Sequence, residues 1–199
     1  MNTLSGFNKF NVLGPQMKSY FSSILLLSFS LISSAQNYDA TSNALGGCGL
    51  TKNNVWSNFT NQAGLAEINQ LIIGAGTENS FGIKELSTHT AVFALPVNGG
   101  VFGLNFSYTG FELYNESKIG LAFAKKLSDN FNIGIQVDYL GVYVDEGANN
   151  HNNFTFEIGA QKRLMRKLTL GAHIFNPIGI QLNEDENIPS IFKLGLRYD

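Results

Sequence analysis

The stretch FNIGIQVDY, residues 131–139, decides the fold class, because its side chains alternate strictly in character. Its odd-numbered positions are large and apolar, from Phe131 to Tyr139, and its even-numbered positions are Asn, Gly, Gln and Asp. Successive side chains of a β-strand point to opposite faces of the sheet. A period of two therefore predicts a strand with one apolar and one polar face.

The same alternation recurs along the chain from about residue 68 onward. It is strong in 101–109, 154–161 and 192–198, and weaker in 69–77, 88–96, 116–126 and 168–176. Together with residues 131–139 these segments make eight candidate strands. No segment carries a sustained period of 3.6, so long amphipathic helices are not expected.

The connections between the candidate strands alternate in length. Residues 97–100, 127–130 and 164–167 are short connections, 78–87, 144–153 and 177–189 are long, and 110–115 is of medium length. Outer-membrane barrels join antiparallel strands by short periplasmic turns and longer extracellular loops. We therefore expect an all-β, antiparallel up-and-down transmembrane β-barrel of about eight strands, preceded by an irregular N-terminal segment.

The composition agrees with a barrel in a membrane. Charged residues make up 14% of the chain, against ~25% in a typical soluble domain. The polar faces repeatedly carry very small residues, which a crowded or curved barrel interior requires; they are Gly103, Gly120, Ala122, Gly134, Gly159, Gly171 and Gly195. A soluble β-sandwich is the alternative, and in it the Phe102, Leu104 and Phe106 face would be buried as core.

The first 35 residues are expected to be a cleaved signal peptide, with Met17 as the true start. Lys18 supplies the positive charge, an apolar run follows, and small residues up to Ala35 form the cleavage site. Export and the barrel pattern together predict the outer membrane of a Gram-negative bacterium. Residues 36–67 then form a periplasmic or lumen-plug segment, and residues 68–199 form the barrel.

A family resemblance lies in this N-terminal segment. A Gly-Gly pair and then Asn-x-Ala-Gly-Leu-Ala precede the first candidate strand; the residues concerned are Gly46, Gly47, Asn61, Ala63, Gly64, Leu65 and Ala66. The pattern resembles the FadL-like outer-membrane proteins and is closest to the PorV/PorQ-like group of Bacteroidetes. Gln62 departs from it, because the family usually has proline there. The resemblance covers about residues 36–199.

This resemblance implies an outer-membrane barrel whose N-terminal segment folds into the lumen, with Asn61, Ala63, Gly64 and Leu65 as the plug motif. It implies porin/FadL-like transport of small or hydrophobic solutes. A non-conducting structural or type IX secretion-associated barrel is the alternative. Family members usually continue with further hairpins, so the chain is either a truncated member or a set of eight strands that closes alone. A closed eight-stranded barrel would leave an interior just wide enough for side chains.

Charged and polar residues on the polar faces are the candidate lumen-lining residues: Glu116, Lys118, Asp138, Glu157, His173, Lys193 and Arg197. Opposite charges can pair across neighbouring strands, either as a structural network or with a selectivity or proton-linked role. No metal-ligand spacing and no catalytic motif is present, so we expect no enzyme, no catalytic residues, no metal and no cofactor. An outer-membrane enzyme relying on His151 is the weakest alternative.

The expected partners follow from the location. They are outer-membrane lipid and lipopolysaccharide and, in the secretion alternative, components of the secretion system. A formal net charge of -2 without a clustered basic face argues against a nucleic-acid partner.

Overall fold

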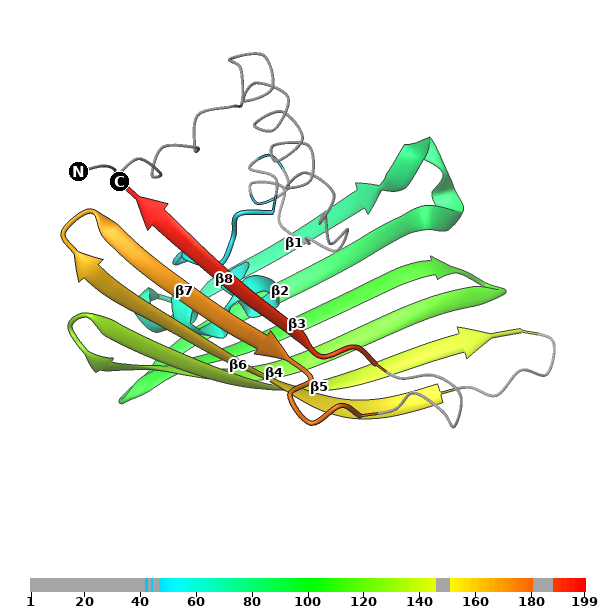
Figure 1. The fold of residues 1–199 in the computed structure, drawn as a ribbon. Coiled ribbons are helices and arrows are strands. Elements are labelled where there is room, and N and C mark those ends of the chain that lie inside the picture. The colour runs from blue at the N-terminus through cyan, green and yellow to red at the C-terminus, as the bar shows by residue number, and fades with distance from the viewer. Residues whose placement is uncertain (1–41, 43, 45–46, 146–150, 181–187) are drawn as a thin grey trace, which may run out of the picture. The chain divides into compact units, whose positions relative to one another are not determined.

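Eight strands form one antiparallel sheet in which the spatial order of the strands is their order in the chain (Figure 1). The strands are β1 Ile72–Asn79, β2 Ser87–Val97, β3 Gly100–Phe111, β4 Tyr114–Ser128, β5 Phe131–Val144, β6 His151–Met165, β7 Leu168–Phe175 and β8 Ile191–Tyr198. The prediction of an all-β, antiparallel, up-and-down arrangement of eight strands is confirmed.

The structure is a computed structural model that describes residues 42, 44, 47–145, 151–180 and 188–199. The predicted signal peptide and the Gly46 position of the family pattern lie outside the described residues. None of the helices among the described residues is long and apolar enough to cross a membrane.

The connections fall at two ends of the sheet, which we call the turn end and the loop end. The turn end carries three two-residue connections, 98–99, 129–130 and 166–167, as expected. The loop end carries the β1–β2 connection, with the short 3-10 helices η2 Ser80–Gly82 and η3 Lys84–Leu86, and the β3–β4 turn.

The expectation of a medium-length loop at 110–115 was wrong. Gly110 pairs with Asn115 and Phe111 pairs with Tyr114, so β3 and β4 continue until only two residues remain between them. Gly110 adopts a φ of 116°, which a glycine reaches without strain. A glycine and an asparagine predict a loop by composition, whereas here the backbone pairing of the two strands extends through them.

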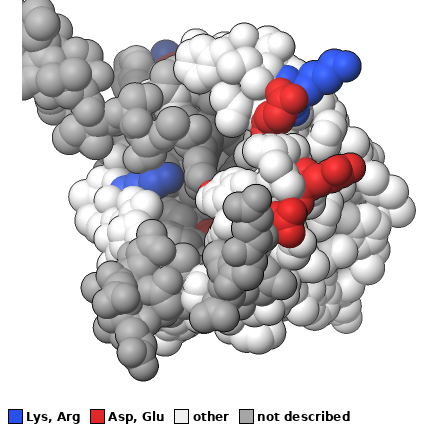
Figure 2. All heavy atoms as spheres, turned by 90° about the vertical axis from the view of Figure 1, so that its right-hand side faces the viewer, with Lys and Arg blue, Asp and Glu red and all other residues white. Residues whose placement is uncertain are grey.

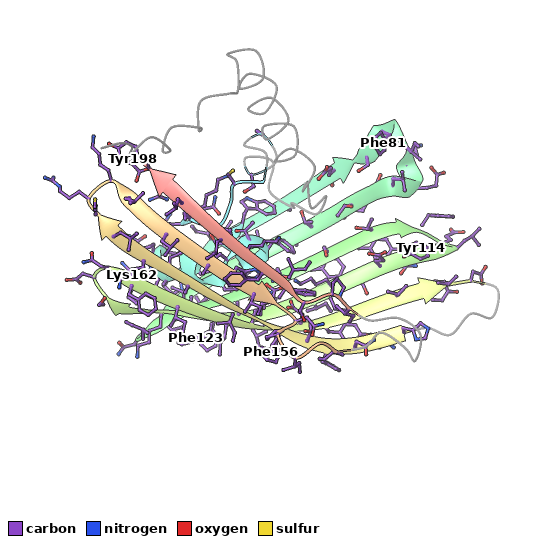
Figure 3. All side chains as sticks on the ribbon, in the orientation of Figure 1. Phe81, Tyr114, Phe123, Phe156, Lys162 and Tyr198 are labelled. Carbon is purple, nitrogen blue, oxygen red and sulfur yellow. The ribbon has the colours of Figure 1, made fainter. Side chains whose placement is uncertain are left out.

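The two faces of the sheet differ in exposure. Phe102, Leu104 and Phe106 on β3 are 40–45% exposed, whereas the side chains between them are buried. Phe123 and Phe156 also point outward, away from the concave side of the sheet (Figure 3). Among the described residues no second sheet covers this outer face. The sandwich alternative, which requires Phe102, Leu104 and Phe106 to be core, is therefore wrong.

The inner face of the sheet is covered by residues 47–67, which we call the docked segment. It contains one helical turn, α3 Ser57–Thr60, followed by the 3-10 helix η1 Gln62–Glu67. Its apolar side chains pack on small residues of β2, β3 and β4 in a core made of Val55, Leu65, Ala66, Ile68, Val92, Ala94, Val101, Ala122 and Ala124. The core of the molecule is thus shared between this segment and the strands.

The sheet is open along β1 and β8, which are its two edges among the described residues. The docked segment reaches both edges. Leu50 lies against Gly195 of β8, and the indole of Trp56 lies over Gly74 and Gly76 of β1. The same segment thus contacts both edge strands, and Figure 1 shows it within the curve of the sheet.

Candidate functional site

Asn61 is the residue that ties the docked segment to the far strands. Its side-chain Oδ1 accepts a hydrogen bond from the backbone N–H of Ala63 at 3.2 Å and so caps η1. Its Nδ2 faces three carbonyl oxygens, those of Leu50 at 2.8 Å, Ala160 at 3.2 Å and Ala172 at 3.3 Å. One fully buried carboxamide therefore joins the segment to β6 and β7.

The rest of the Asn-x-Ala-Gly-Leu motif is explained by close packing. Ala63 and Leu65 are both 0% exposed. A Cβ at Gly64 would overlap the carbonyl oxygen of Lys52 and approach the Ser57 hydroxyl, so only glycine fits this position. The motif thus specifies how the segment folds on itself and how it docks on the sheet.

The glycines of the inner face lie under the docked segment. A Cβ on each would meet Asn58 at Gly103, Gln62 at Gly134, Asn61 at Gly159, and Leu50 at both Gly171 and Gly195. Gly134 pairs directly with Gly159, and Gly171 pairs directly with Gly195. These positions require small residues because the docked segment approaches the strands closely there. Gly120 differs, because it is covered by side chains of its neighbouring strands.

Four of the seven predicted lumen-lining residues meet in one buried cluster on β4–β7. The Lys118 ammonium lies 2.5 Å from Glu157 Oε1 and 3.3 Å from Asp138 Oδ1. His173 Nε2 lies 2.9 Å from Glu157 Oε2. Asp138 is 0% exposed, Glu157 2% and His173 4%, so these ionisable groups are withdrawn from water. We call these four residues the charge cluster.

Three amide side chains extend the charge cluster, and none of them was among the predicted lumen-lining residues. Gln62 of η1 donates a hydrogen bond to Glu157 Oε2 at 2.5 Å, and this bond joins the docked segment directly to β6. Gln136 donates to Asp138 at 2.7 Å, and Asn105 donates to Gln136 at 2.9 Å. Asn105 and Gln136 stand on the polar faces of their strands, which is the signal that could have found them. Gln62, the departure from the family pattern, makes the contact with Glu157.

The other three predicted lumen residues lie apart from the charge cluster. Glu116 accepts a hydrogen bond from the Tyr114 hydroxyl near the loop end. Lys193 lies directly across from His173 in the β7–β8 register, and its ammonium forms no ion pair among the described residues. Arg197 donates to the Thr51 carbonyl oxygen at 2.5 Å and lies 3.1 Å from Asp199.

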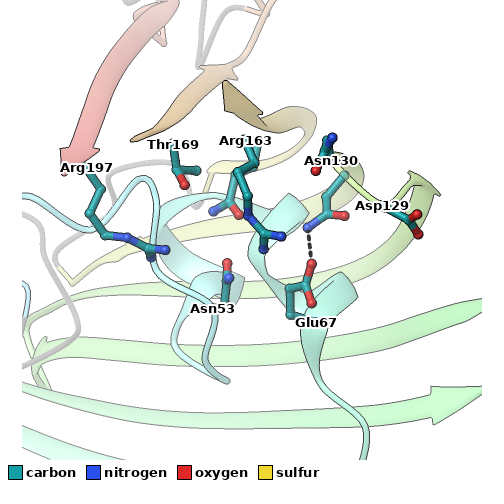
Figure 4. A pocket seen from close by; sticks show the side chains of 9 residues that line it. Asn53, Glu67, Asp129, Asn130, Arg163, Thr169 and Arg197 are labelled. Carbon is teal, nitrogen blue, oxygen red and sulfur yellow. Dashed lines mark hydrogen bonds between the residues drawn. The ribbon is translucent and has the colours of Figure 1, made fainter. Parts of the chain in front are cut away.

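A small polar cleft, partly open to solvent, lies at the turn end (Figure 4). Strands β6, β7 and β8 contribute Arg163, Thr169 and Arg197, and the docked segment contributes Asn53 and Glu67. Among the described residues, no group of three or more His, Cys, Asp or Glu side chains is arranged to hold a metal ion.

Glu67 anchors the end of the docked segment beside this cleft. Its carboxylate lies 2.6 Å from the Lys126 ammonium and accepts a hydrogen bond from Asn132 at 3.0 Å. Burial by itself raises the pKa of Glu67, but the bonds and charge of Lys126, with Asn132 and Arg163, outweigh it. The pKa of this carboxyl is therefore lowered from its ordinary value of 4.5.

We expect this lowered pKa to make docking of the segment sensitive to acid. A carboxyl whose folded-state pKa is depressed contributes stability above its unfolded-state pKa, and that stability is lost as the pH falls through the folded-state value. Trp56, the only tryptophan of the chain, lies in the docked segment and reports docking by its fluorescence. Glu67→Gln should remove the part of the transition below about pH 4.5, an effect of at most about 1 kcal/mol because the pair is partly exposed. Glu112→Gln, in the exposed β3–β4 turn, is the control, and an unchanged acid transition in Glu67→Gln would contradict the assignment.

Comparison with solved structures shows a structural similarity. No protein-family model matches the chain, and no curated protein matches it. Among solved structures, the chain is similar to the CymD monoaromatic hydrocarbon channel, with 12% sequence identity and a TM-score of 0.46. The similarity covers 67% of this chain and 51% of the channel, so the chain spans about half the length of that protein.

Proposed function

We propose that the chain is an outer-membrane β-barrel protein for porin/FadL-like transport of small or hydrophobic solutes, with the docked segment as its lumen plug. The supporting observation is the outer face of the sheet, an exposed apolar surface that spans the strands. Its members include Phe102, Leu104, Phe106, Ile119, Leu121, Ile135, Val137, Phe154, Phe192, Leu194 and Leu196. Soluble monomers rarely expose an apolar patch of more than a few hundred Å², and contact with lipid accounts for it.

The strand lengths support the same proposal. A transmembrane strand tilted by about 45° needs about 9–11 residues. The four central strands, β3 to β6, are 12, 15, 14 and 15 residues long. Each can therefore cross the hydrocarbon layer and continue into the water on at least one side.

The docked segment supports a ring wider than eight strands. A closed eight-stranded barrel has an interior that is just filled by side chains, whereas here the inner face also carries a folded segment that contacts both β1 and β8. Unpaired backbone groups at a strand edge are costly in lipid. We therefore propose that the edges of β1 and β8 pair with further strands in the membrane.

Substituting arginine at two depths on β4 tests the placement in lipid. Leu121 lies in the middle of β4 on its outer face, and Leu127 lies near the turn end in the register shift between Lys126 and Ser128; they are 58% and 54% exposed. Arginine facing lipid costs about 2–4 kcal/mol at the midplane and about 0–1 kcal/mol near the interface. We expect Leu121→Arg to reduce folding into vesicles, measured by the change in gel mobility on boiling, and Leu127→Arg to leave it nearly intact. Equal behaviour of the two variants would refute the proposed membrane placement.

Transport itself is tested with liposomes that contain the full-length protein. Uptake of a labelled aromatic hydrocarbon and of a small polar solute should exceed that of liposomes without protein. Uptake of neither solute by folded protein, as verified by the gel, would reject the transport function while leaving the barrel intact.

A non-conducting structural or type IX secretion-associated barrel is the second candidate. It is favoured by the filling of the inner face, where the side chains of Asn58, Asn61, Gln62 and Leu65 are all 0% exposed. Such a barrel would recruit periplasmic partners through the N-terminal segment. Cys48 is a free, exposed thiol in that segment, and it offers a natural site for cross-linking in native membranes. A specific secretion-system partner recovered together with absent solute uptake would favour this second function.

A further inference from the structure

Two arginines face each other across one row of the sheet at the turn end. In the β6–β7 register Arg163 is directly opposite Thr169, and in the β7–β8 register Thr169 is directly opposite Arg197. Neighbouring strands lie about 4.8 Å apart, so the two arginine backbones are separated by about 10 Å. Their side chains are long enough to meet over the small threonine between them.

All three side chains line the polar cleft at the turn end. Figure 4 shows the guanidinium groups of Arg163 and Arg197 reaching into the cleft from different strands, with Thr169 between them and Asn53 of the docked segment facing them. Two guanidinium groups, a hydroxyl and a carboxamide thus line one space, together with the carboxylates of Glu67 and Asp129. Guanidinium groups hold planar carboxylates and phosphates through paired hydrogen bonds.

Two acids, Glu67 and Asp129, also line the cleft, but among the described residues neither of them forms an ion pair with Arg163 or Arg197. Among the described residues the Arg163 guanidinium makes no hydrogen bond or ion pair, and the Thr169 hydroxyl, on a residue only 8% exposed, has no hydrogen-bond partner. Glu67, the carboxylate of the docked segment in the cleft, is occupied by Lys126 and Asn132. Arg197 is shared between Asp199 and the Thr51 carbonyl oxygen, which fixes its position.

The residues around the cleft make the electrostatic potential at the turn end more positive. Among the described residues, the strands and turns of the turn end carry Lys125, Lys126, Lys162, Arg163, Arg166, Lys167 and Arg197 against the acids Glu67, Asp129 and Asp199. The loop end is the opposite: its described residues include the acids Glu78, Glu85, Glu112, Glu116 and Asp145 against Lys84, and Figure 2, viewed onto this end, shows Asp and Glu side chains on its rim. An anion is therefore attracted to the turn end and repelled from the loop end.

We propose that this cleft is an anion-binding site in which Arg163 and Arg197 hold a phosphate or carboxylate group, with Thr169 and Asn53 as further hydrogen-bond donors. A ligand held there contacts β6, β8 and the docked segment at once. Its binding therefore stabilises docking of the segment. The site is independent of whether the barrel conducts, since only the cleft and its arginines are needed.

Inorganic phosphate is the first probe, added to the detergent-solubilised full-length protein and followed by isothermal titration and by the Trp56 unfolding midpoint. We expect binding in the wild type and an upward shift of the midpoint. Arg163→Gln should weaken binding at least 10-fold, and Arg163→Lys should recover it only in part because a lysine cannot form paired bonds. Arg166→Gln removes the same charge from the adjacent exposed turn and should bind phosphate like the wild type.

Short-chain phosphatidylglycerol in place of phosphate distinguishes the two sources of the anion. Arg163-dependent binding of the lipid but not of phosphate assigns the site to a lipid headgroup, and binding of both assigns it to any phosphate group. Arg197→Gln should weaken binding as Arg163→Gln does, and the gel-mobility assay verifies that each variant is folded. Absent binding of both probes, or equal loss of affinity in Arg163→Gln and Arg166→Gln, would overturn the proposal. Neither result bears on solute uptake, so the proposed transport function is tested separately.

Discussion

Replacing Lys118 with methionine is expected to lower the free energy of unfolding by about 3–5 kcal/mol, the range for removing one partner of a buried ion pair. The Lys118 ammonium faces both Asp138 and Glu157, and these carboxylates are 0% and 2% exposed. Without it, the Asp138 and Glu157 carboxyl groups remain buried near each other with no ammonium group between them. Methionine keeps the length and much of the packing of the lysine side chain, so the loss reports mainly on charge.

Urea unfolding of the refolded barrel, followed by Trp56 fluorescence, measures this effect. Lys193→Met is the matched control, because Lys193 lies on the same face two strands beyond β6 and forms no ion pair among the described residues. The double variant Lys118→Met with Glu157→Gln removes one charge of each sign and should be more stable than Lys118→Met alone. If Lys118→Met unfolded like Lys193→Met, the charge cluster would not hold the barrel together.

The strands were predictable because their signal is local. Each of the eight alternates within itself, and the exposed outer face shows that the alternation was assigned to the correct sides. The prediction at 110–115 was wrong because it used a local signal for a feature that depends on the neighbouring strand. Composition at Gly110 and Asn115 indicates a loop, but whether a strand continues depends on its partner, and here the partner residues remain paired.

The charge cluster was predictable only in part, because its geometry depends on the register of four strands. The polar faces identify Lys118, Asp138, Glu157 and His173 as candidates, but equally identify Glu116, Lys193 and Arg197. Gln136 lies directly opposite Glu157, and Gly120 lies directly opposite Asp138. These pairings bring the first four candidates together. No single strand contains that information.

Docking of the N-terminal segment is the least local feature. Gln62 meets Glu157 across 95 positions of the chain, and Asn61 reaches Ala172 across 111. In the sequence, two patterns stood apart. One was the small residues on the polar faces of the strands, and the other was the Asn-x-Ala-Gly-Leu motif that precedes the first strand. The structure explains both by one contact surface, because the motif fits only where the strands lack side chains.

Gly159→Ala is accordingly the substitution that should separate the segment from the sheet. A Cβ at Gly159 would overlap Asn61 Oδ1 and lie 3.1 Å and 3.2 Å from the backbone nitrogens of Gln62 and Ala63. Overpacking costs about 1–3 kcal/mol, and displacing Asn61 leaves its buried partners unpaired at about 1–3 kcal/mol more. We expect blue-shifted Trp56 fluorescence to be lost and the docked segment to become sensitive to protease, while the strands remain folded.

Gly141→Ala is the matched control for this variant, because the added Cβ would meet chiefly the Ser117 hydroxyl, the end of a side chain that can rotate away. Both substitutions place an alanine in a strand, so a difference between them reports on docking and not on the strand. If the docked segment is the plug of a channel, Gly159→Ala liposomes should take up solute faster than Gly141→Ala liposomes. Undocking without faster uptake would show that the segment does not gate solute, which would favour the non-conducting barrel. Retained docking in Gly159→Ala would mean that the segment is not held by its fit to the glycines.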